Sequence, residues 1–298
     1  MINSLQDYLS SRTVKYEVEK ELKEISHLKI GGVAPLILYP KTENELVDLV
    51  GMLFSNKIRY KILGRTTNIL FLDKRSEFVF VSTRQLDQVY SDLNTVVCEA
   101  GVSLPILINC LANRGIGGAE ELSGIPGSIG GAVVSNAGAF GKEISNYIST
   151  VRVYYPNFDL VIDIPAKDCG FSYRSSSFSE SECVVISARL KFANMDPELI
   201  KNRLLKYRKK RIESQPTGAL SLGSVFKQVN GVSAGFYIDR CGLKGKKIGG
   251  AMIAYKHAGF ILNNGYAKAT DYLSLMTLAK SEVKKKFSVD LVPEIKII

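Results

Sequence analysis

The stretch "SGIPGSIGGAVVSNAGAFG", residues 123–141, holds six glycines and no charged side chain. Because glycine has no Cβ, such a segment lets another group approach the main chain closely, and successive backbone N–H groups can bind an anion. The same glycines would also let two packed elements cross at short range. The residues alone favour both hypotheses equally: a cradle for an anionic or flat ligand, or a tight crossing.

A second glycine-centred turn, "LGRTTNILF" at residues 63–71, follows a predicted strand. It offers Thr66, Thr67 and Asn68, small donors that can contact phosphate oxygens, although a plain polar turn is the simpler interpretation. No G-x-G-x-x-G opens a helix, and "GAFGKE" at residues 138–143 lacks the Ser or Thr of a Walker A loop. Two such turns in a basic chain indicate a long cofactor with a diphosphate.

The composition is typical of a globular protein: 298 residues, 46% hydrophobic and 23% charged, with a formal charge of +10. Five scattered cysteines and two histidines, His27 and His257, predict neither a disulfide framework nor a metal site. No apolar run is long enough to span a membrane, and the charged opening differs from a signal peptide. We therefore expect a cytoplasmic protein that acts on an anionic partner.

The hydrophobic patterning predicts an α+β chain. At Asp196 the pattern changes from β-rich segments to a long helix, with Asp196 as N-cap and Pro197 in the first turn, so we expect a domain boundary there. The predicted helices begin near residues 42, 104, 197, 234 and 270, and the predicted strands lie near residues 35–40, 60–71, 78–83, 95–101, 150–165, 183–192, 223–228, 251–263 and 291–298.

The run "KYRKKR" at residues 206–211 lies in that long helix and has the composition of a nucleic-acid patch. However, Ile200, Leu204 and Tyr207 form one apolar stripe with the cations mostly around it. A solvated helix face is therefore the favoured interpretation.

Three residues could carry chemistry. Arg174, beside Tyr173, has a guanidinium that fits a carboxylate; Ser224 follows a glycine and precedes Lys227 by three positions. Taken alone, a surface arginine and an edge strand are the simpler interpretations of these two segments. Glu294 stands in an otherwise apolar final segment, where a carboxylate is costly unless it is paired or exposed.

Taken in order, seven segments resemble the UDP-N-acetylenolpyruvoylglucosamine reductase family (MurB) of bacterial peptidoglycan synthesis, from about residue 25 to the end. Between Arg174 and Asp196 the chain is short, which resembles the shorter, loopless subtype (type II). The segments are "LKIGG", "LGRTTNILF", "SGIPGSIGGAVVSNAGAFG", "YRSSSF", "LGSVFKQ", "AGFYIDRCGLKGKKIGGAMIAYKHAGFILN" and "PEIKII".

The resemblance implies a PCMH-type FAD-binding region of two lobes, residues 1–85 and 86–195, with the PCMH-type part at about 28–195. A C-terminal α+β substrate-binding domain follows at residues 196–298, and its final strand can pack back on the FAD region. It also implies noncovalent FAD held by Gly64, Arg65, Thr66, Thr67, Asn68, Ile69, Gly124, Ile125, Ser128, Gly130, Gly131 and Val133.

The activity implied by the resemblance is a UDP-N-acetylmuramate dehydrogenase with NADPH as hydride donor. The enolpyruvyl ether of UDP-N-acetylglucosamine receives a hydride from flavin N5 at C3 and a proton from Ser224 at C2, giving UDP-N-acetylmuramate. Arg174 would bind the substrate carboxylate and Glu294 would assist it. Further substrate contacts are implied for Tyr173, Asn136, Lys227 and Gln228, and we expect a monomer without nucleic-acid or membrane partners.

Three places depart from the pattern of the resembled family. Thr66-Thr67 stands where Gly-Ser is usual, Gln228-Val229 where Asn-Pro is common, and Phe140 where tyrosine is common. Two alternative classes are a PCMH-type flavoprotein oxidase and a basic nucleic-acid-binding protein. Since covalent FAD in such oxidases is commonly attached to histidine, the two histidines favour noncovalent flavin.

Overall fold

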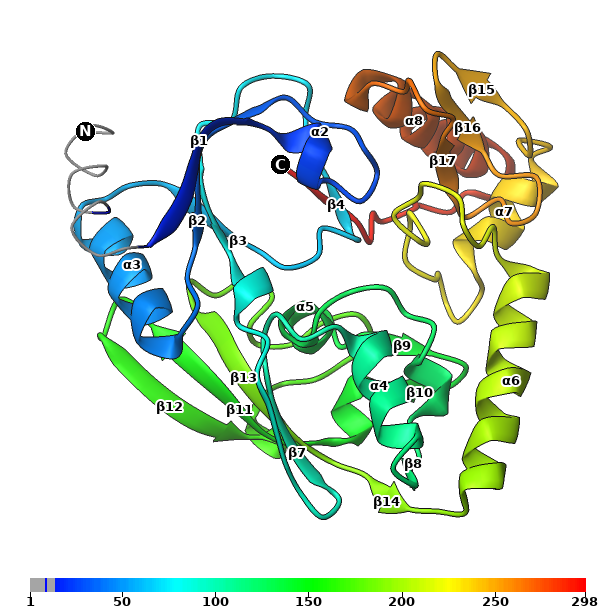
Figure 1. Ribbon diagram of the computed structural model, residues 1–298. Helices are drawn as coiled ribbons and strands as arrows, with labels where there is room; N and C mark the ends of the chain where they lie inside the picture. The colour runs from blue at the N-terminus through cyan, green and yellow to red at the C-terminus, as the bar shows by residue number, and fades with distance from the viewer. Residues whose placement is uncertain (1–8, 10–13) are drawn as a thin grey trace. The chain divides into compact units, whose positions relative to one another are not determined.

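The computed structural model describes residues 9 and 14–298 (Figure 1), so part of the opening segment used to predict the location lies outside the described residues. Contacts divide the chain into two compact units. The first unit contains the residues up to Val18, Pro35–Arg65 and Glu77–Arg208, and the second contains Glu19–Ala34, Thr66–Ser76 and Lys209–Ile298. The predicted three-lobe division stays a prediction.

A five-stranded antiparallel sheet forms one layer of the first unit (Figure 1). Its buried face, with Val96 and Val151, packs against helices α4 (Leu104–Ala112) and α5 (Ile129–Val134). Helix α4 and four of the strands were predicted, whereas α5 and β6 were not. The strand order is β12 (Leu160–Pro165), β11 (Ile148–Tyr155), β13 (Val184–Lys191), β7 (Thr95–Glu99) and β6 (Val89–Asp92).

Helix α3 (Glu43–Ser55) joins two strands of a second sheet, in which β2, β5 and β3 run parallel. The Thr42 side chain accepts a hydrogen bond from the Glu45 N–H at 3.2 Å, as the predicted helix start requires. The predicted face of α3 is buried at Leu46, Leu49, Val50 and Leu53. The strand order is β1 (Lys15–Glu21), β2 (Val33–Tyr39), β5 (Val79–Ser82) and β3 (Tyr60–Leu63).

The core of the second unit is built around helix α8 (Ala269–Phe287), whose Tyr272 and Leu275 are fully buried. The helices near residues 234 and 270 and the strands within 251–263 confirm the predictions. The other elements of this core are α7 (Ala234–Arg240), the antiparallel strands β15 (Lys247–Ile248), β16 (Ala251–Ile253) and β17 (Ile261–Asn263), and β18 (Lys296–Ile297), which pairs in parallel with β4 (Ile69–Leu70).

The predicted strand at residues 223–228 is wrong, because this segment forms no continuous ladder. Its backbone donors go to two different partners: the Val225 N–H donates to the Gly259 carbonyl, and the Lys227 N–H donates to the Val292 carbonyl, both at 2.9 Å. The predicted final strand is shortened to β18. Both segments are therefore extended loops held by isolated backbone bonds.

Helix α6 (Pro197–Ser214) begins as predicted, since the Asp196 carboxylate accepts a hydrogen bond from the Glu198 N–H at 2.8 Å. Ile200 is its one buried residue, and most of its cations are exposed, as a solvated helix face requires. The remaining short elements are α2 (Leu22–Ile25), β8 (Ile116–Gly117), β9 (Gly138–Ala139), β10 (Lys142–Glu143), β14 (Ala193–Asn194) and the 3-10 turns η1 (Thr83–Gln85), η2 (Glu120–Leu122), η3 (Ile144–Asn146) and η4 (Ala166–Asp168).

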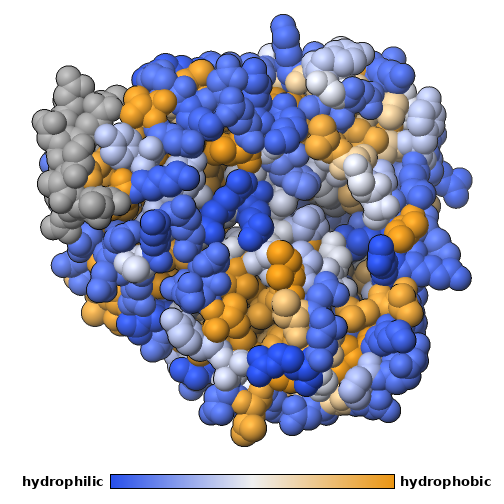
Figure 2. Space-filling model, viewed as in Figure 1, coloured by the Kyte–Doolittle hydropathy of each residue, from blue (hydrophilic) through white to orange (hydrophobic). Residues whose placement is uncertain are grey.

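Figure 2 shows a face that is mostly hydrophilic, with apolar side chains in small groups. Within the described part of the chain, no helix combines the length and the hydrophobicity needed to cross a membrane. Among the same residues, no group of three or more His, Cys, Asp or Glu side chains is arranged to hold a metal ion.

Candidate active site

The glycine-rich stretch forms the short helix α5, and its two adjacent glycines have different environments. The Gly130 N–H donates to the Ala100 carbonyl at 2.9 Å, and a Cβ built on Gly130 would lie 2.8 Å from the Cβ of Ala100. Gly131 is exposed, and its Cβ would meet Ser128 Oγ at 3.5 Å. The tight-crossing hypothesis therefore holds for Gly130, whereas Gly131 leaves main chain open to a ligand.

Ser128 joins the two glycine-centred turns within the first unit. It is buried, and its hydroxyl oxygen accepts a hydrogen bond from the Gly131 N–H at 3.4 Å as the N-cap of α5. A Cβ on Gly64 would lie only 2.5 Å from Ser128 Oγ. Gly64 and Gly131 are thus brought together, and Gly124 adds further exposed backbone to the same stretch.

Two arginines add positive charge beside these glycines. The Arg84 Nε donates to the Gly64 carbonyl at 3.2 Å, and Arg65 Nη2 lies 3.5 Å from the Gly101 carbonyl. Burial, together with the charge of Arg65, holds the pKa of Arg84 below its usual value. A diphosphate would relieve this repulsion, so backbone and charge both fit an anionic cofactor. Arg84 was not among the residues predicted from the sequence, where its only signal is its position just after a predicted strand.

Thr66 shapes the second turn from within the second unit. Its backbone lies in the left-handed region, with φ of 57°, where a β-branched residue is uncommon and glycine is favoured. The buried hydroxyl donates to the Ile25 carbonyl and accepts from the His27 N–H, both at 3.0 Å. Since its proton is used internally, Thr66 can offer a phosphate its backbone N–H but not this hydroxyl.

The second unit also brings together Asn68, Ser224 and Glu294. The Asn68 side-chain amide donates to the Glu294 carbonyl at 3.2 Å, and the Glu294 N–H donates to the Val225 carbonyl at 2.8 Å. Glu294 is therefore hydrogen-bonded to the residue that directly follows Ser224, although 70 positions separate Glu294 from Ser224 in sequence. Both side chains are half-buried, as are Thr67 and Ile69 on the same turn.

The Ser224 hydroxyl donates to the Phe226 carbonyl at 3.3 Å, a long bond that it can exchange for a bound partner. Lys227, half-buried, is held by its backbone bond to Val292, and Gln228 is exposed beside it. The structure thus places three of the predicted substrate and proton-transfer residues on one loop of the second unit.

Arg174 lies at the tip of a tight turn in the first unit. The backbones of Ser172 and Ser175 exchange two hydrogen bonds of 3.1 Å, which forces Tyr173 and Arg174 into the turn, and Arg174 has a φ of 53°. Its Nη2 donates to the Gly138 carbonyl at 2.9 Å, and its guanidinium carbon lies 5.2 Å from the centre of the Tyr173 ring. Left-handed backbone at a non-glycine residue is costly and is concentrated at functional sites.

The Asn136 side chain is fully buried and turned inward. Its amide nitrogen donates to Glu143 Oε2 at 2.8 Å and to the Ser172 carbonyl at 3.0 Å, while its oxygen accepts from the Ser145 N–H at 3.3 Å. These bonds tie the glycine-rich stretch to the Arg174 turn. Val133 is also fully buried, so it can offer a ligand only backbone.

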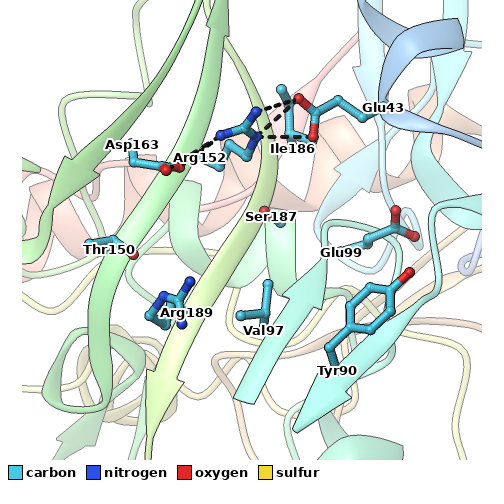
Figure 3. A pocket seen from close by; sticks show the side chains of 10 residues that line it. All are labelled: Glu43, Tyr90, Val97, Glu99, Thr150, Arg152, Asp163, Ile186, Ser187 and Arg189. Carbon is cyan, nitrogen blue, oxygen red and sulfur yellow. Dashed lines mark hydrogen bonds and ion pairs between the residues drawn. The ribbon is translucent and has the colours of Figure 1, made fainter. Parts of the chain in front are cut away.

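A polar hollow of about 260 Å³ lies on the other face of the five-stranded sheet and contains no predicted site residue (Figure 3). Asp163, Arg152, Ser187 and Glu99 are aligned across neighbouring strands, and Arg152 pairs with Glu43 at 2.9 Å and with Asp163 at 3.4 Å. Burial raises the pKa of Glu99. The residues that line the hollow are Glu43, Tyr90, Val97, Glu99, Thr150, Arg152, Asp163, Ile186, Ser187 and Arg189.

Comparisons with known proteins show the family to which the chain is similar. The family model of the FAD binding domain matches residues 34–161, so the chain falls in the class of FAD-binding proteins. The family model of the UDP-N-acetylenolpyruvoylglucosamine reductase C-terminal domain matches residues 215–298.

Full-length relatives extend this result. The UDP-N-acetylenolpyruvoylglucosamine reductase of Caldanaerobacter subterraneus is 37% identical over all of this chain and 98% of its own, and that of Fervidobacterium nodosum is 38% identical over 94% and 91%. The crystal structure of the Thermus caldophilus reductase (MurB) superposes with a TM-score of 0.81 and 31% identity, covering 95% of this chain and 98% of that one. The chain belongs to the UDP-N-acetylenolpyruvoylglucosamine reductase family, which confirms the resemblance and the α+β fold expected from sequence.

Proposed function

We propose that this chain is an FAD-dependent UDP-N-acetylenolpyruvoylglucosamine reductase that uses NADPH to form UDP-N-acetylmuramate for cell-wall synthesis. The proposal is carried by two hydrogen bonds, one from the Glu294 N–H to the Val225 carbonyl and one from the Asn68 amide to the Glu294 carbonyl. They bring the segment of the Ser224 hydroxyl, the segment of the Glu294 carboxylate and the predicted cofactor turn together within the second unit. The full-length similarity to reductases supports it.

The cofactor would be held noncovalently by the two glycine-centred turns. Gly64 and Gly131 provide close backbone at Ser128, and Arg65 and Arg84 provide charge for the diphosphate. When bound, FAD supplies the hydride that reaches C3 of the enolpyruvyl group. The uncharged stretch around Gly131 suits this chemistry, because a dry pocket with backbone donors limits competing reactions with water.

Arg174 would bind the substrate carboxylate through its guanidinium fork. One nitrogen is already anchored on the Gly138 carbonyl, which fixes the plane of the group and lowers the cost of ordering it. Charge accumulates on C2 and the carboxylate as C3 is reduced, and a fixed cation stabilises that charge. Glu294 would assist the reaction by hydrogen bonding or by holding a proton.

Ser224 would give its proton to C2, leaving the bond to the Phe226 carbonyl to do so. A serine is a weak acid, but a C2 carbanion is far more basic than water, so the transfer runs downhill. Lys227 and Gln228 would contact the substrate diphosphate, with Tyr173 as a further contact. Asn136 would contribute to substrate binding by holding the Arg174 turn through its hydrogen bond to the Ser172 carbonyl.

Replacing Ser224 with alanine tests the assigned role. We expect NADPH to bleach the flavin of S224A at nearly the normal rate, while reoxidation by the enolpyruvyl substrate slows by orders of magnitude. Ser274→Ala, which changes an exposed serine on α8, is the matched control. Equal losses in both half-reactions would show that Ser224 is not the proton donor.

The proposal includes noncovalent flavin, a monomeric state, a cytoplasmic location, and no nucleic-acid or membrane partner. The five cysteines are free thiols, as suits a reducing compartment. Acid precipitation should release the flavin into the supernatant, whereas flavin retained on the pellet would favour the oxidase alternative. Sedimentation of the holoenzyme, alone and with duplex DNA, tests the monomer and the absence of nucleic-acid binding.

A further inference from the structure

Helix α6 is tied to the residues directly before the glycine-rich stretch by two side-chain contacts. The Tyr207 hydroxyl donates to Glu121 Oε1 at 2.8 Å, and Arg203 Nη1 lies 3.8 Å from Glu120 Oε2. Both acids belong to the turn η2, and both partners lie on one side of α6, four residues apart. Neither tie is part of the site described above.

Glu120 is an unusual place for a carboxylate, because its side chain is 1% exposed. Its Oε1 accepts a hydrogen bond from the Gly118 N–H at 2.6 Å. A Cβ on Gly117 would lie 2.6 Å from that same oxygen and 2.7 Å from Ile200 Cγ1, so helix and turn are packed without spare room. Burying a carboxylate is costly unless its partners offset the lost hydration, which indicates that this contact has a role.

Tyr207 contacts a second element as well. Its ring lies 5.3 Å from the ring of Phe140, between β9 and β10. Close by, the Tyr147 hydroxyl donates to the Gly118 carbonyl at 2.6 Å, and burial with the charges of Glu121 and Glu120 raises the pKa of Tyr147. The turn η2 is thus held from several sides.

The same turn leads straight into the glycine-rich stretch. The Glu120 carbonyl accepts hydrogen bonds from the Ser123 hydroxyl at 2.8 Å and from the Ser123 N–H at 3.2 Å, and the Ile125 N–H donates to the Leu122 carbonyl at 2.9 Å. Consecutive hydrogen-bonded turns therefore connect Glu120 and Glu121 to Gly124 and Ile125.

We propose that Glu121 and Tyr207 are positioning residues that hold residues 123–131 in the conformation that binds FAD, with Glu120 and Arg203 as a second tie. The proposal rests on the function proposed above, since it takes this stretch as a wall of the FAD site. The basic run 206–211, interpreted from sequence as a solvated helix face, thereby gains a role through Tyr207, its one aromatic residue.

The test is FAD affinity, measured by fluorescence titration of the deflavinated full-length chain with FAD. We expect Tyr207→Phe and Glu121→Ala each to raise the FAD dissociation constant about 10- to 150-fold, the range for a lost hydrogen bond to a charged group. The double variant should bind FAD no more weakly than the single variant with the lower affinity, because both substitutions remove the same hydrogen bond. Glu121→Gln keeps an acceptor oxygen and should stay within about twofold of the parent protein.

Tyr90→Phe, at an exposed tyrosine on β6, is the matched control. The flavin absorption spectrum of each reconstituted variant gives a second measurement, which a loss of stability alone would not shift. If Glu121→Ala fails to fold, Tyr207→Phe and Glu121→Gln still give a contrast, since one removes the donor and the other keeps the acceptor.

Two results would overturn the proposal: FAD affinities of Tyr207→Phe and Glu121→Ala within twofold of the parent protein, or losses that add in the double variant. Gly131→Leu separates this failure from a failure of the proposed site. If Gly131→Leu weakens FAD binding and the two single variants do not, only the positioning role is wrong. If Gly131→Leu binds FAD normally, the stretch is not a wall of the FAD site, and the positioning role fails with it.

Discussion

Gly130 and Gly131 are adjacent in α5, yet a methyl group added at Gly130 should lower stability and one added at Gly131 should not. A Cβ at Gly130 would lie 2.8 Å from the Cβ of Ala100 and 3.2 Å from its carbonyl oxygen, well inside the optimum of about 3.5–4.0 Å between carbon atoms. The 2.9 Å bond from the Gly130 N–H to that carbonyl prevents the helix from sliding away. We expect Gly130→Ala to lower the free energy of unfolding by about 1–3 kcal/mol, the usual cost of overpacking.

At Gly131 the new methyl group would meet only Ser128 Oγ, at 3.5 Å. Because alanine is favoured over glycine in a helix by about 0.5–1 kcal/mol, Gly131→Ala should leave stability unchanged or raise it. Its methyl group would enter the proposed cofactor cradle, so FAD affinity should fall. Urea unfolding of both apo variants at 25 °C, followed by FAD titration, measures the two quantities separately. Equal stability of the two variants would refute the packing argument.

Three further changes can be tested by urea unfolding. The buried Tyr272 hydroxyl has no hydrogen-bond partner among the described residues, so Tyr272→Phe should raise the free energy of unfolding by about 1 kcal/mol, and a loss of that size would contradict this. Asn263→Ala should lower it by about 2–4 kcal/mol, because the buried amide donates to the Leu28 carbonyl and accepts two backbone N–H groups. Burial lowers the pKa of His257, whose Nδ1 accepts a hydrogen bond from the Gly259 N–H. As the pH falls, the unfolded chain therefore takes up the proton before the folded chain does. The contribution of His257 to stability is complete above about pH 6.5 and is lost as the pH falls through the lower pKa of the folded state. His257→Gln should flatten the pH dependence of unfolding below pH 6.5, and an unchanged slope would exclude His257 as its source.

The sequence predicts what depends on neighbours along the chain. The periodic apolar face of α3 and the Asp196 cap of α6 are local signals, and both are confirmed. The difference between Gly130 and Gly131 depends on Ala100, about 30 positions away, so no local pattern could reveal it.

The misplaced strand at residues 223–228 has the same origin. Its composition favours an extended chain, but its backbone partners, Gly259 and Val292, belong to two separate later segments that no spacing rule links. The hydroxyl of Thr66 and the amide of Asn136 illustrate a further limit, since residue type shows that a side chain can donate but not whether another group already uses the donor.

The pairing of β18 with β4 has a consequence for the order of events during protein synthesis. The Lys296 N–H donates to the Asn68 carbonyl at 2.9 Å, and Asn68 reaches Glu294 across 226 positions of sequence. The turn after Thr66 leaves the ribosome early, but the strand that holds it emerges more than two hundred residues later. The pairing of this turn with β18 can therefore form only after translation has ended, so flavin uptake would report that the second unit has folded.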